Sequence, residues 1–170
     1  FDLTEEQQLL KDSVEGFLAD TYDFESRKKI AALPGGWSPD VWAKFAELGI
    51  LGLPFSEEDG GFGGGAVETM LLAESFGKYL VLEPYLATVV LGGGVLKRAG
   101  SAEQKADNIA TIADGSRTFA LATTERHSRY DLFDVTTSAK KDGASYILDG
   151  EKAVVVNGGT ADRIIVSART

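Results

Sequence analysis

The chain reads SYILDGEK at residues 145–152 and VVVNGGTAD at residues 154–162. Short runs rich in β-branched and aromatic residues, separated by Asp-Gly or Gly-Gly, are typical of strands joined by tight turns. Asp142-Gly143 predicts a further turn, because this dipeptide favours the backbone conformation of a two-residue hairpin. Strands are expected at residues 117–123, 134–139, 144–148, 152–156 and 164–168.

The first 115 residues have helical spacing instead. Thr4 and Gln7 have the spacing of a capping box, and Pro39 suits the first turn of a helix because its missing amide needs no partner there. Helices are expected directly after Thr4 and at residues 25–32, 39–48, 66–79, 84–98 and 102–114. Helices followed by strands predict an α+β protein, with an all-helical N-terminal domain at residues 1–115 and the first part of an antiparallel β domain at residues 116–170.

Two glycine clusters have more than one interpretation. Residues 60–65 read GGFGGG, but a phosphate-binding loop needs a preceding strand and a following Lys-Ser or Lys-Thr, and the sequence has neither. A turn whose glycines take positive φ angles is favoured. The glycines at 92–94 fall inside a predicted helix, where they indicate close packing against a neighbour or a kink.

Charge and composition exclude several classes of function. The formal net charge is −9, which argues against nucleic-acid binding. Residues 1–115 carry 19 acidic and 9 basic side chains, whereas residues 116–170 carry 7 and 8. The second part is therefore the better place for a nucleotide, although chance is a rival explanation for so short a segment.

The chain has no Cys and one His, so disulfides, thiolate metal sites and multi-histidine centres are excluded. The lack of Cys fits a reducing cytoplasm, which is the expected compartment. No apolar run approaches the roughly 20 residues of a membrane span, and no secretion signal is visible.

The strand pattern stops at Thr170, and the chain does not begin with Met. Five short strands without a covering layer would leave two edges and one apolar face unpaired. We therefore expect these residues to be a fragment of a longer protein.

Six stretches resemble, in this order, those of acyl-CoA dehydrogenases. No single stretch is specific, but together they span nearly the whole chain. Within this family, residues 83–88 (EPYLAT) and 128–131 (SRYD) are similar to the small subunit of pimeloyl-CoA dehydrogenase. The six stretches are residues 3–7 (LTEEQ), Trp42 with residues 47–54 (ELGILGLP), residues 57–63 (EEDGGFG), 100–105 (GSAEQK), 124–125 (TE) and 148–152 (LDGEK).

The resemblance implies a helical N-terminal domain, a β middle domain and a C-terminal helical bundle that is absent from this chain. It implies FAD, held non-covalently between the β domain and the bundle, and α,β-dehydrogenation of an acyl-CoA thioester. The catalytic base of the family is usually a Glu in the C-terminal part, so Glu125 is not that base and no catalytic residue is expected here. The implied partners are an electron-transferring flavoprotein and further subunits, in a homotetramer or in a heteromer with a second acyl-CoA dehydrogenase subunit.

The resemblance also assigns FAD contacts. The Thr of the family's Thr-Glu-Pro-x-Ala-Gly-Ser-Asp motif falls on Thr124, whose hydroxyl and neighbouring amides would meet the pyrimidine edge of the flavin. A Thr that satisfies a turn at a strand end is the alternative. The motif then changes, with Arg126, Arg129 and Tyr130 at the Pro, Gly and Ser positions. Arginines there bind pyrophosphate, CoA phosphates or a distal carboxylate, or else are merely solvated. The expected cofactor-binding residues are Ala122, Thr124, Arg129, Tyr130, Val154 and Val156.

Residues 154–156 are three valines where the family usually has Trp-Ile-Thr or Trp-Ile-Ser. In the family the Trp packs beside the isoalloxazine and the hydroxyl bonds near N5, which valine cannot do. Two hypotheses follow: a catalytic flavoenzyme that uses main-chain amides of this segment, or a non-catalytic, flavin-poor partner subunit that shapes the active site of a related chain. Family geometry would place acyl-chain contacts around Tyr85, Thr88 and Leu91, which core packing explains equally well.

Overall fold

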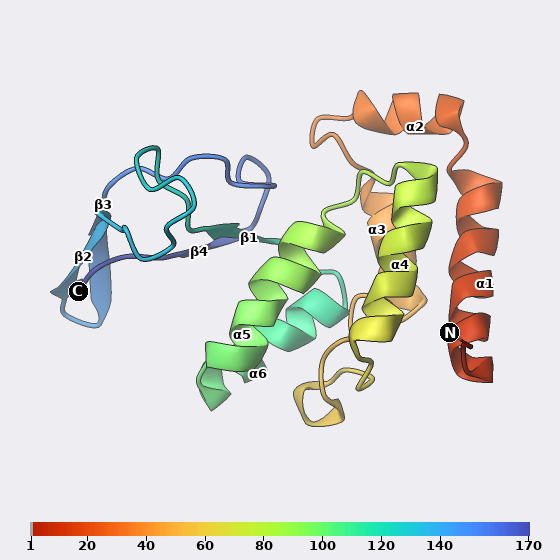
Figure 1. Ribbon diagram of the computed structural model, residues 1–170, viewed down its shortest axis with the longest axis horizontal. Coiled ribbons are helices and arrows are strands. Elements are labelled where there is room, and N and C mark those ends of the chain that lie inside the picture. Colours follow the sequence, from red (N-terminus) through yellow and green to blue (C-terminus); the bar gives the residue numbers. More distant parts are fainter. Residues whose placement is uncertain (1) are drawn as a thin grey trace.

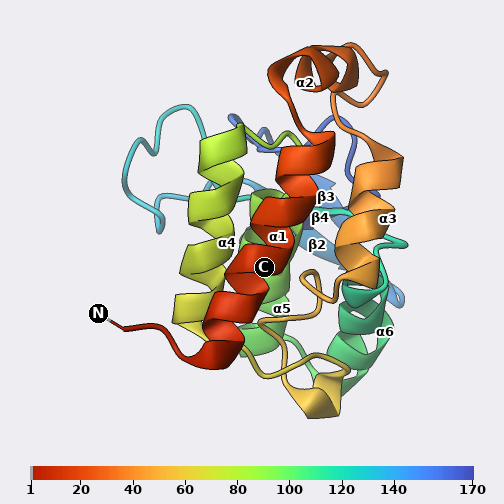
Figure 2. The same cartoon turned by 90° about the vertical axis from the view of Figure 1, so that its right-hand side faces the viewer.

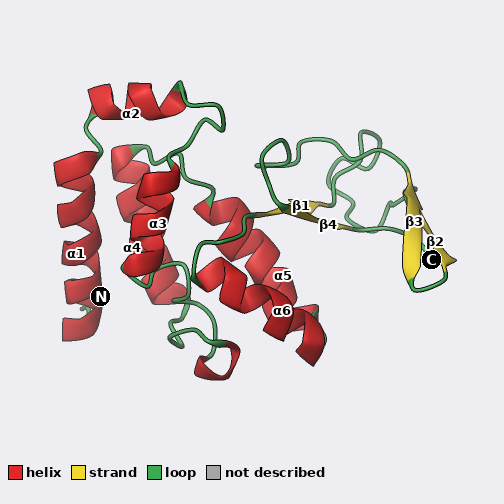
Figure 3. Ribbon diagram, turned by 180° about the vertical axis from the view of Figure 1, so that it is seen from behind, coloured by secondary structure: helices red, strands yellow, loops and turns green. Residues whose placement is uncertain are grey.

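The computed structural model describes residues 2–170 and shows a helical body beside a smaller β part (Figure 1). In the view from behind, helices and strands occupy opposite ends of the molecule (Figure 3). The helices are α1 (Glu5–Thr21), α2 (Phe24–Ala31), α3 (Pro39–Glu47), the 3₁₀ turn η1 (Glu57–Asp59), α4 (Ala66–Tyr79), the π-helix η2 (Leu86–Gly92), α5 (Gly93–Ala99) and α6 (Ala102–Ala113). The strands are β1 (Phe119–Ala122), β2 (Ser138–Asp142), β3 (Ser145–Asp149) and β4 (Arg163–Val166). The predicted α+β class is confirmed.

The helices begin at the caps that the sequence predicts. The Thr4 hydroxyl accepts a hydrogen bond from the Gln7 amide at 3.2 Å, and the Gln7 side chain accepts one from the Thr4 amide at 3.1 Å. Ser101 and Gln104 form the same reciprocal pair at the start of α6. In residues 2–170, no helix combines the length and the apolar character needed to cross a membrane.

The helical body has an aromatic core. Phe45 stacks on Phe76 with ring centroids 5.1 Å apart, and Phe76 meets Tyr85 edge-on at the same distance. Phe119, the first residue of β1, is buried in the same apolar cluster. Figure 2 shows this body from the side of α1, with α1 and α4 in front and α5 and α6 behind. The helices and β1 therefore share one core.

The strands form two separate pairs. β2 and β3 pair antiparallel around the predicted turn at Asp142-Gly143. β1 and β4 pair in parallel, which departs from the uniformly antiparallel domain expected from the sequence. The strand predicted at 134–139 begins only at Ser138, because the preceding residues are occupied by a loop that packs around Glu125.

The prediction of a strand at residues 152–156 is wrong, because the structure has no strand there. Val154 has a φ of +54°, which breaks an extended chain. The segment contacts the loop after β1 through a 2.9 Å hydrogen bond from the Ala153 amide to the Thr124 carbonyl. Three β-branched residues favour a strand only when a neighbouring strand completes the ladder. β1 pairs with β4 instead, so the local preference of the valines is overridden.

Glycine is required where helices and loops approach most closely. A Cβ on Gly61 would lie 2.4 Å from the Phe55 carbonyl oxygen, and one on Gly92 would lie 2.8 Å from the Cβ of Phe119. Gly60 has a φ of +85°. Residues 60–65 thus form a packed turn, and the glycines at 92–94 bring η2 and α5 against their neighbours.

We predict opposite effects of alanine at two helical glycines. Gly92→Ala should lower the free energy of unfolding by about 1–3 kcal/mol, because the added methyl overlaps Phe119. Gly16→Ala, in the exposed middle of α1 with nothing within 4 Å of its added Cβ, should raise it by about 0.5–1 kcal/mol. Urea unfolding of both variants measures the two effects. Equal effects would mean that η2 does not pack against β1 as described.

Candidate functional site

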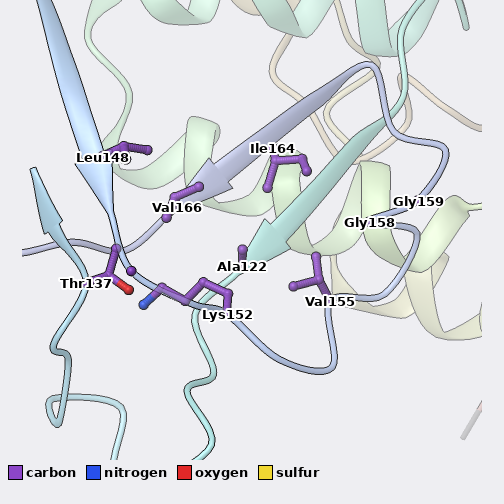
Figure 4. Close-up of a pocket in the computed structure, with 10 residues that line it drawn as sticks. Ala122, Thr137, Leu148, Lys152, Val155, Gly158, Gly159, Ile164 and Val166 are labelled. Atoms are coloured by element: carbon purple, nitrogen blue, oxygen red, sulfur yellow. The ribbon is translucent and has the colours of Figure 1, made fainter.

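A cavity of about 470 Å³ lies against the parallel strands β1 and β4 (Figure 4). It extends from Ala122 and Val166, the last residues of the two strands, to Gly158 and Gly159, which precede β4. The rest of the wall comes from Thr137, Leu148, Gly150, Lys152, Val155, Gly158, Gly159 and Ile164.

The wall is largely apolar. Leu148 and Ile164 leave 51% and 47% of their surfaces exposed, although both are large aliphatic side chains. Lys152 is the one charged residue among those that line the cavity. The volume falls in the range of roughly 300–1,000 Å³ that is typical of small-molecule sites. The cavity therefore suits a mainly apolar group.

The segment after Lys152 adds hydrogen-bond donors. Within residues 2–170, the amides of Val154, Val155 and Val156 donate to no backbone carbonyl. The Nδ2 atom of Asn157 is buried without a partner. A desolvated donor without an acceptor costs about 1–3 kcal/mol, which an acceptor on a ligand would recover. Asn157 Nδ2 is therefore a buried donor that a further acceptor would satisfy.

Beside the cavity, the Glu125 carboxylate is 2% exposed and accepts five hydrogen bonds. The Thr136 amide and hydroxyl donate to Oε2 at 2.9 and 2.5 Å, and the Thr137 amide and hydroxyl donate to Oε1 at 3.0 and 2.6 Å. Lys152 Nζ donates to Oε1 at 2.7 Å and to the Ser167 hydroxyl at 3.0 Å. One carboxylate thus joins the loop after β1, the chain before β2 and the segment after β3.

The surrounding donors hold the pKa of the Glu125 carboxyl far below its usual range. The hydrogen bond from Lys152 is the largest cause, followed by those from the hydroxyls of Thr136 and Thr137. His127 Nε2 lies 3.6 Å from Glu125 Oε2 and 3.3 Å from Asp134 Oδ1. Glu125 is therefore ionised at neutral pH and serves as a fixed anchor.

The residues expected to bind a cofactor lie at different distances from this cavity. Ala122 lines it, and the Thr124 carbonyl holds the Ala153 amide at its edge. Val154 is 85% exposed and does not line the cavity, and neither does Val156. The exposed Arg129 and Tyr130 lie in the loop 125–137, also outside the wall. Their roles in cofactor binding stay predictions.

The structure adds residues that sequence reasoning did not assign to the site. They are Thr137, Leu148, Lys152, Val155, Ile164 and Val166 in the wall, with Glu125 behind it. Two family motifs in the sequence could have indicated this ion pair. They are Thr124-Glu125, which contains its acid, and LDGEK at 148–152, which contains its base. Nothing in their spacing of 27 residues shows that the two side chains meet.

Comparisons with known proteins identify this α+β architecture. The family model "Acyl-CoA dehydrogenase, N-terminal domain" matches residues 4–116. The probable acyl-CoA dehydrogenase YngJ of Bacillus subtilis is 32% identical over 100% of this chain and 45% of its own length. The chain belongs to the acyl-CoA dehydrogenase family. It spans less than half the length of such curated relatives.

Two solved structures are similar to the fold. The acyl-CoA dehydrogenase of Bacillus anthracis complexed with FAD has a TM-score of 0.88, with 28% identity, and the match covers 98% of this chain and 29% of that chain. The ChsE4-ChsE5 complex of Mycobacterium tuberculosis has a TM-score of 0.86 with 28% identity over 98% of this chain and 44% of that chain.

We predict a pH-dependent role of Glu125 in stability. Because its folded pKa is depressed, its contribution is fully present above the unfolded value of about 4.3 and is lost as pH falls towards the folded value. Glu125→Gln should therefore be less stable than the wild type near pH 7, and the difference should shrink below about pH 4. Urea unfolding across this range measures it, with exposed Glu151→Gln as a control that should show no comparable loss. A difference that stays constant down to about pH 3 would contradict the assignment.

Proposed function

We propose that the chain forms the helical and first β portions of an FAD-dependent acyl-CoA dehydrogenase that desaturates the α,β bond of an acyl-CoA thioester. The observation that carries the proposal is the match of residues 4–116 to the family model, in a chain that also has the family motifs at Thr124-Glu125 and at residues 148–152. When bound, FAD would supply the acceptor for the hydride of the β-carbon, and removal of the α-proton by a base would then leave an enoyl-CoA. That base is expected outside these residues.

The cavity residues would hold the ring by contact and by main-chain donors. Ala122, Val155 and Ile164 supply apolar wall, and the amides of residues 154–156 supply donors. A preorganised amide costs no reorientation when charge develops on its acceptor. Main-chain amides of residues 154–156 are the candidates to replace the hydroxyl that Val156 lacks. Thr124, Arg129 and Tyr130 remain candidates for contacts to the pyrimidine edge and the pyrophosphate.

A second groove is the candidate site of the acyl chain. It encloses about 230 Å³ between α4 and η2 and is lined by Ala73, Phe76, Tyr85, Leu86 and Val90, among others. Tyr85 was one of the residues expected there from family geometry. Thr88 faces β1 instead, since its hydroxyl accepts a hydrogen bond from the Phe119 amide at 3.0 Å. An apolar groove of this size accommodates a short alkyl chain.

The finer assignments rest on resemblance. Pimeloyl-CoA or another dicarboxyl-CoA is the specific substrate that residues 83–88 and 128–131 suggest, with the electrons passing to an electron-transferring flavoprotein. A homotetramer or a heteromer is expected, and a reducing cytoplasm is the expected compartment. The alternative function, a flavin-poor partner subunit, is favoured by the valines at 154–156, which provide no side-chain donor. The similarity to one chain of a ChsE4-ChsE5 complex agrees with a heteromer.

The visible spectrum of the full-length protein tests the proposal. We expect purified protein to carry about one FAD per chain and to lose its flavin colour on anaerobic addition of an acyl-CoA. Butyryl-, octanoyl- and pimeloyl-CoA compared at equal concentration rank the substrate. Colourless protein that acquires FAD only with a second acyl-CoA dehydrogenase subunit would replace the enzyme by the partner-subunit alternative.

Arg129→Ala tests whether the variant loop contacts the ligand. Loss of one charge-assisted hydrogen bond, worth about 1.5–3 kcal/mol, should weaken FAD binding or raise the KM for acyl-CoA by roughly 10-fold or more. Lys141→Ala on exposed β2 is the control for a lost positive charge and should leave both unchanged. Unchanged FAD content together with an unchanged KM would show that Arg129 is only solvated.

A further inference from the structure

A buried acid lines the groove between α4 and η2. Glu83 lies in the linker that joins these two helices and is 6% exposed. The wall around it includes the apolar side chains of Phe76, Leu86 and Val90. Among the described residues that line this groove, Glu83 is the one with a charged side chain. An otherwise largely apolar groove therefore contains a carboxyl group in its wall.

Neutral donors hold this carboxyl group in place. Oε2 accepts a hydrogen bond from the Tyr22 hydroxyl at 2.8 Å, and Oε1 accepts one from the Ser38 amide at 3.1 Å. The Tyr22 oxygen itself accepts from the Leu82 amide at 2.9 Å, so its own proton is available to Glu83. Within residues 2–170, no Lys, Arg or His nitrogen lies within 4 Å of either oxygen. Both oxygens of Glu83 are acceptors, and no ion pair offsets their charge.

The two contacts of Glu83 do not by themselves require a charge. Glu83 connects Tyr22, directly after α1, with Ser38, which begins α3. A glutamine has the acceptor and the donors to make both contacts. The carboxylate differs from that amide in its negative charge, and a charge in a poorly hydrated wall acts strongly on any group that comes near it. The charge is therefore the property of Glu83 that a ligand in the groove would sense.

We propose that Glu83 is a specificity-determining residue of the acyl groove, which admits chains with an apolar or cationic far end and rejects chains with a distal carboxylate. The inference rests on the proposed function, in which this groove holds the acyl chain of the thioester. A second carboxylate beside Glu83 would be a like charge, and both anions would lose part of their hydration. A methyl end meets the apolar wall, and an ammonium end pairs with Glu83. The substrate class is therefore an acyl-CoA without a distal carboxylate, in contrast to the dicarboxyl-CoA that the resemblance of residues 83–88 suggests.

A neighbouring pocket is the rival position for a distal carboxylate. It encloses about 300 Å³, shares Thr69 and Val90 with the acyl groove, and includes Lys97 and Arg98 in its wall. Both cationic side chains are exposed. Water already solvates them, so they gain little from an ion pair with a substrate. The buried acid Glu83 therefore outweighs them in the choice of substrate.

Three substrates of equal chain length test the inference on the full-length protein. Heptanoyl-CoA, ω-aminoheptanoyl-CoA and pimeloyl-CoA differ only at the far end, which is a methyl, an ammonium or a carboxylate group. We expect kcat/KM to be about 10-fold higher for heptanoyl-CoA than for pimeloyl-CoA, and higher for the ammonium end than for the carboxylate end. A groove that is only apolar would disfavour both charged ends alike. This order needs no variant, so it tests the inference whether or not a Glu83 variant folds.

Glu83→Gln then assigns the discrimination to this residue. We expect the ratio of kcat/KM for pimeloyl-CoA to kcat/KM for heptanoyl-CoA to rise about 10-fold, because the like charge is removed while the hydrogen bonds to Tyr22 and Ser38 can form again. Glu74→Gln is the matched control. It removes an exposed acid from α4 that does not line the groove, and it should leave the ratio unchanged.

The outcomes separate the inference from the proposed function. Equal rejection of both charged ends, or equal ratios in the wild type and in Glu83→Gln, overturns the inference and leaves the proposed function standing. A wild-type preference for pimeloyl-CoA does the same and favours the pocket of Lys97 and Arg98. Wild-type protein that oxidises none of the three thioesters overturns both.

Discussion

The β part depends on the buried carboxylate of Glu125. Between residues 123 and 170, the buried residues are Glu125, Ser128 and Thr137, all of them polar. The Ser128 hydroxyl accepts from the Glu125 amide at 3.2 Å and donates to its carbonyl at 2.9 Å, which closes the turn that carries the carboxylate. Within residues 123–170 a polar network holds the loops together, and such a network orders its loops only when its groups are satisfied.

The helical body is held together by an apolar core, and it contacts the β part where η2 packs against β1. Phe119 enters the aromatic core, and the Thr88 hydroxyl of η2 accepts a hydrogen bond from its amide. A π-helix places its side chains differently from an α-helix and is frequent at functional sites. Here it turns Thr88 towards β1 while Leu86 and Val90 line the groove beside α4. One face of η2 therefore packs against β1, and another lines the groove beside α4.

Local signals in the sequence predicted the helices well and the β part less well. Capping residues such as Thr4 and Ser101 act on amides three positions away, so their effect is visible in the sequence. The site depends on contacts over longer distances, such as Glu125 with Lys152, which no periodicity encodes. The side chains that share a face also differ from the prediction. A strand at 152–156 would place Lys152, Val154 and Val156 on one face. Val154 instead has a positive φ, and Val155 lines the cavity together with Lys152.

The same contrast leaves apolar side chains of the β part uncovered. Within residues 2–170, Leu148 and Ile164 leave about half of their surfaces in water, and Val154 leaves more, although burial of such side chains would stabilise the fold at about 25 cal/mol per Å². Glu125 fixes the segments on which these side chains stand, so the segments cannot close over them. Any apolar partner that binds this face would therefore stabilise the folded state by mass action, about 2.7 kcal/mol at 100 times the dissociation constant.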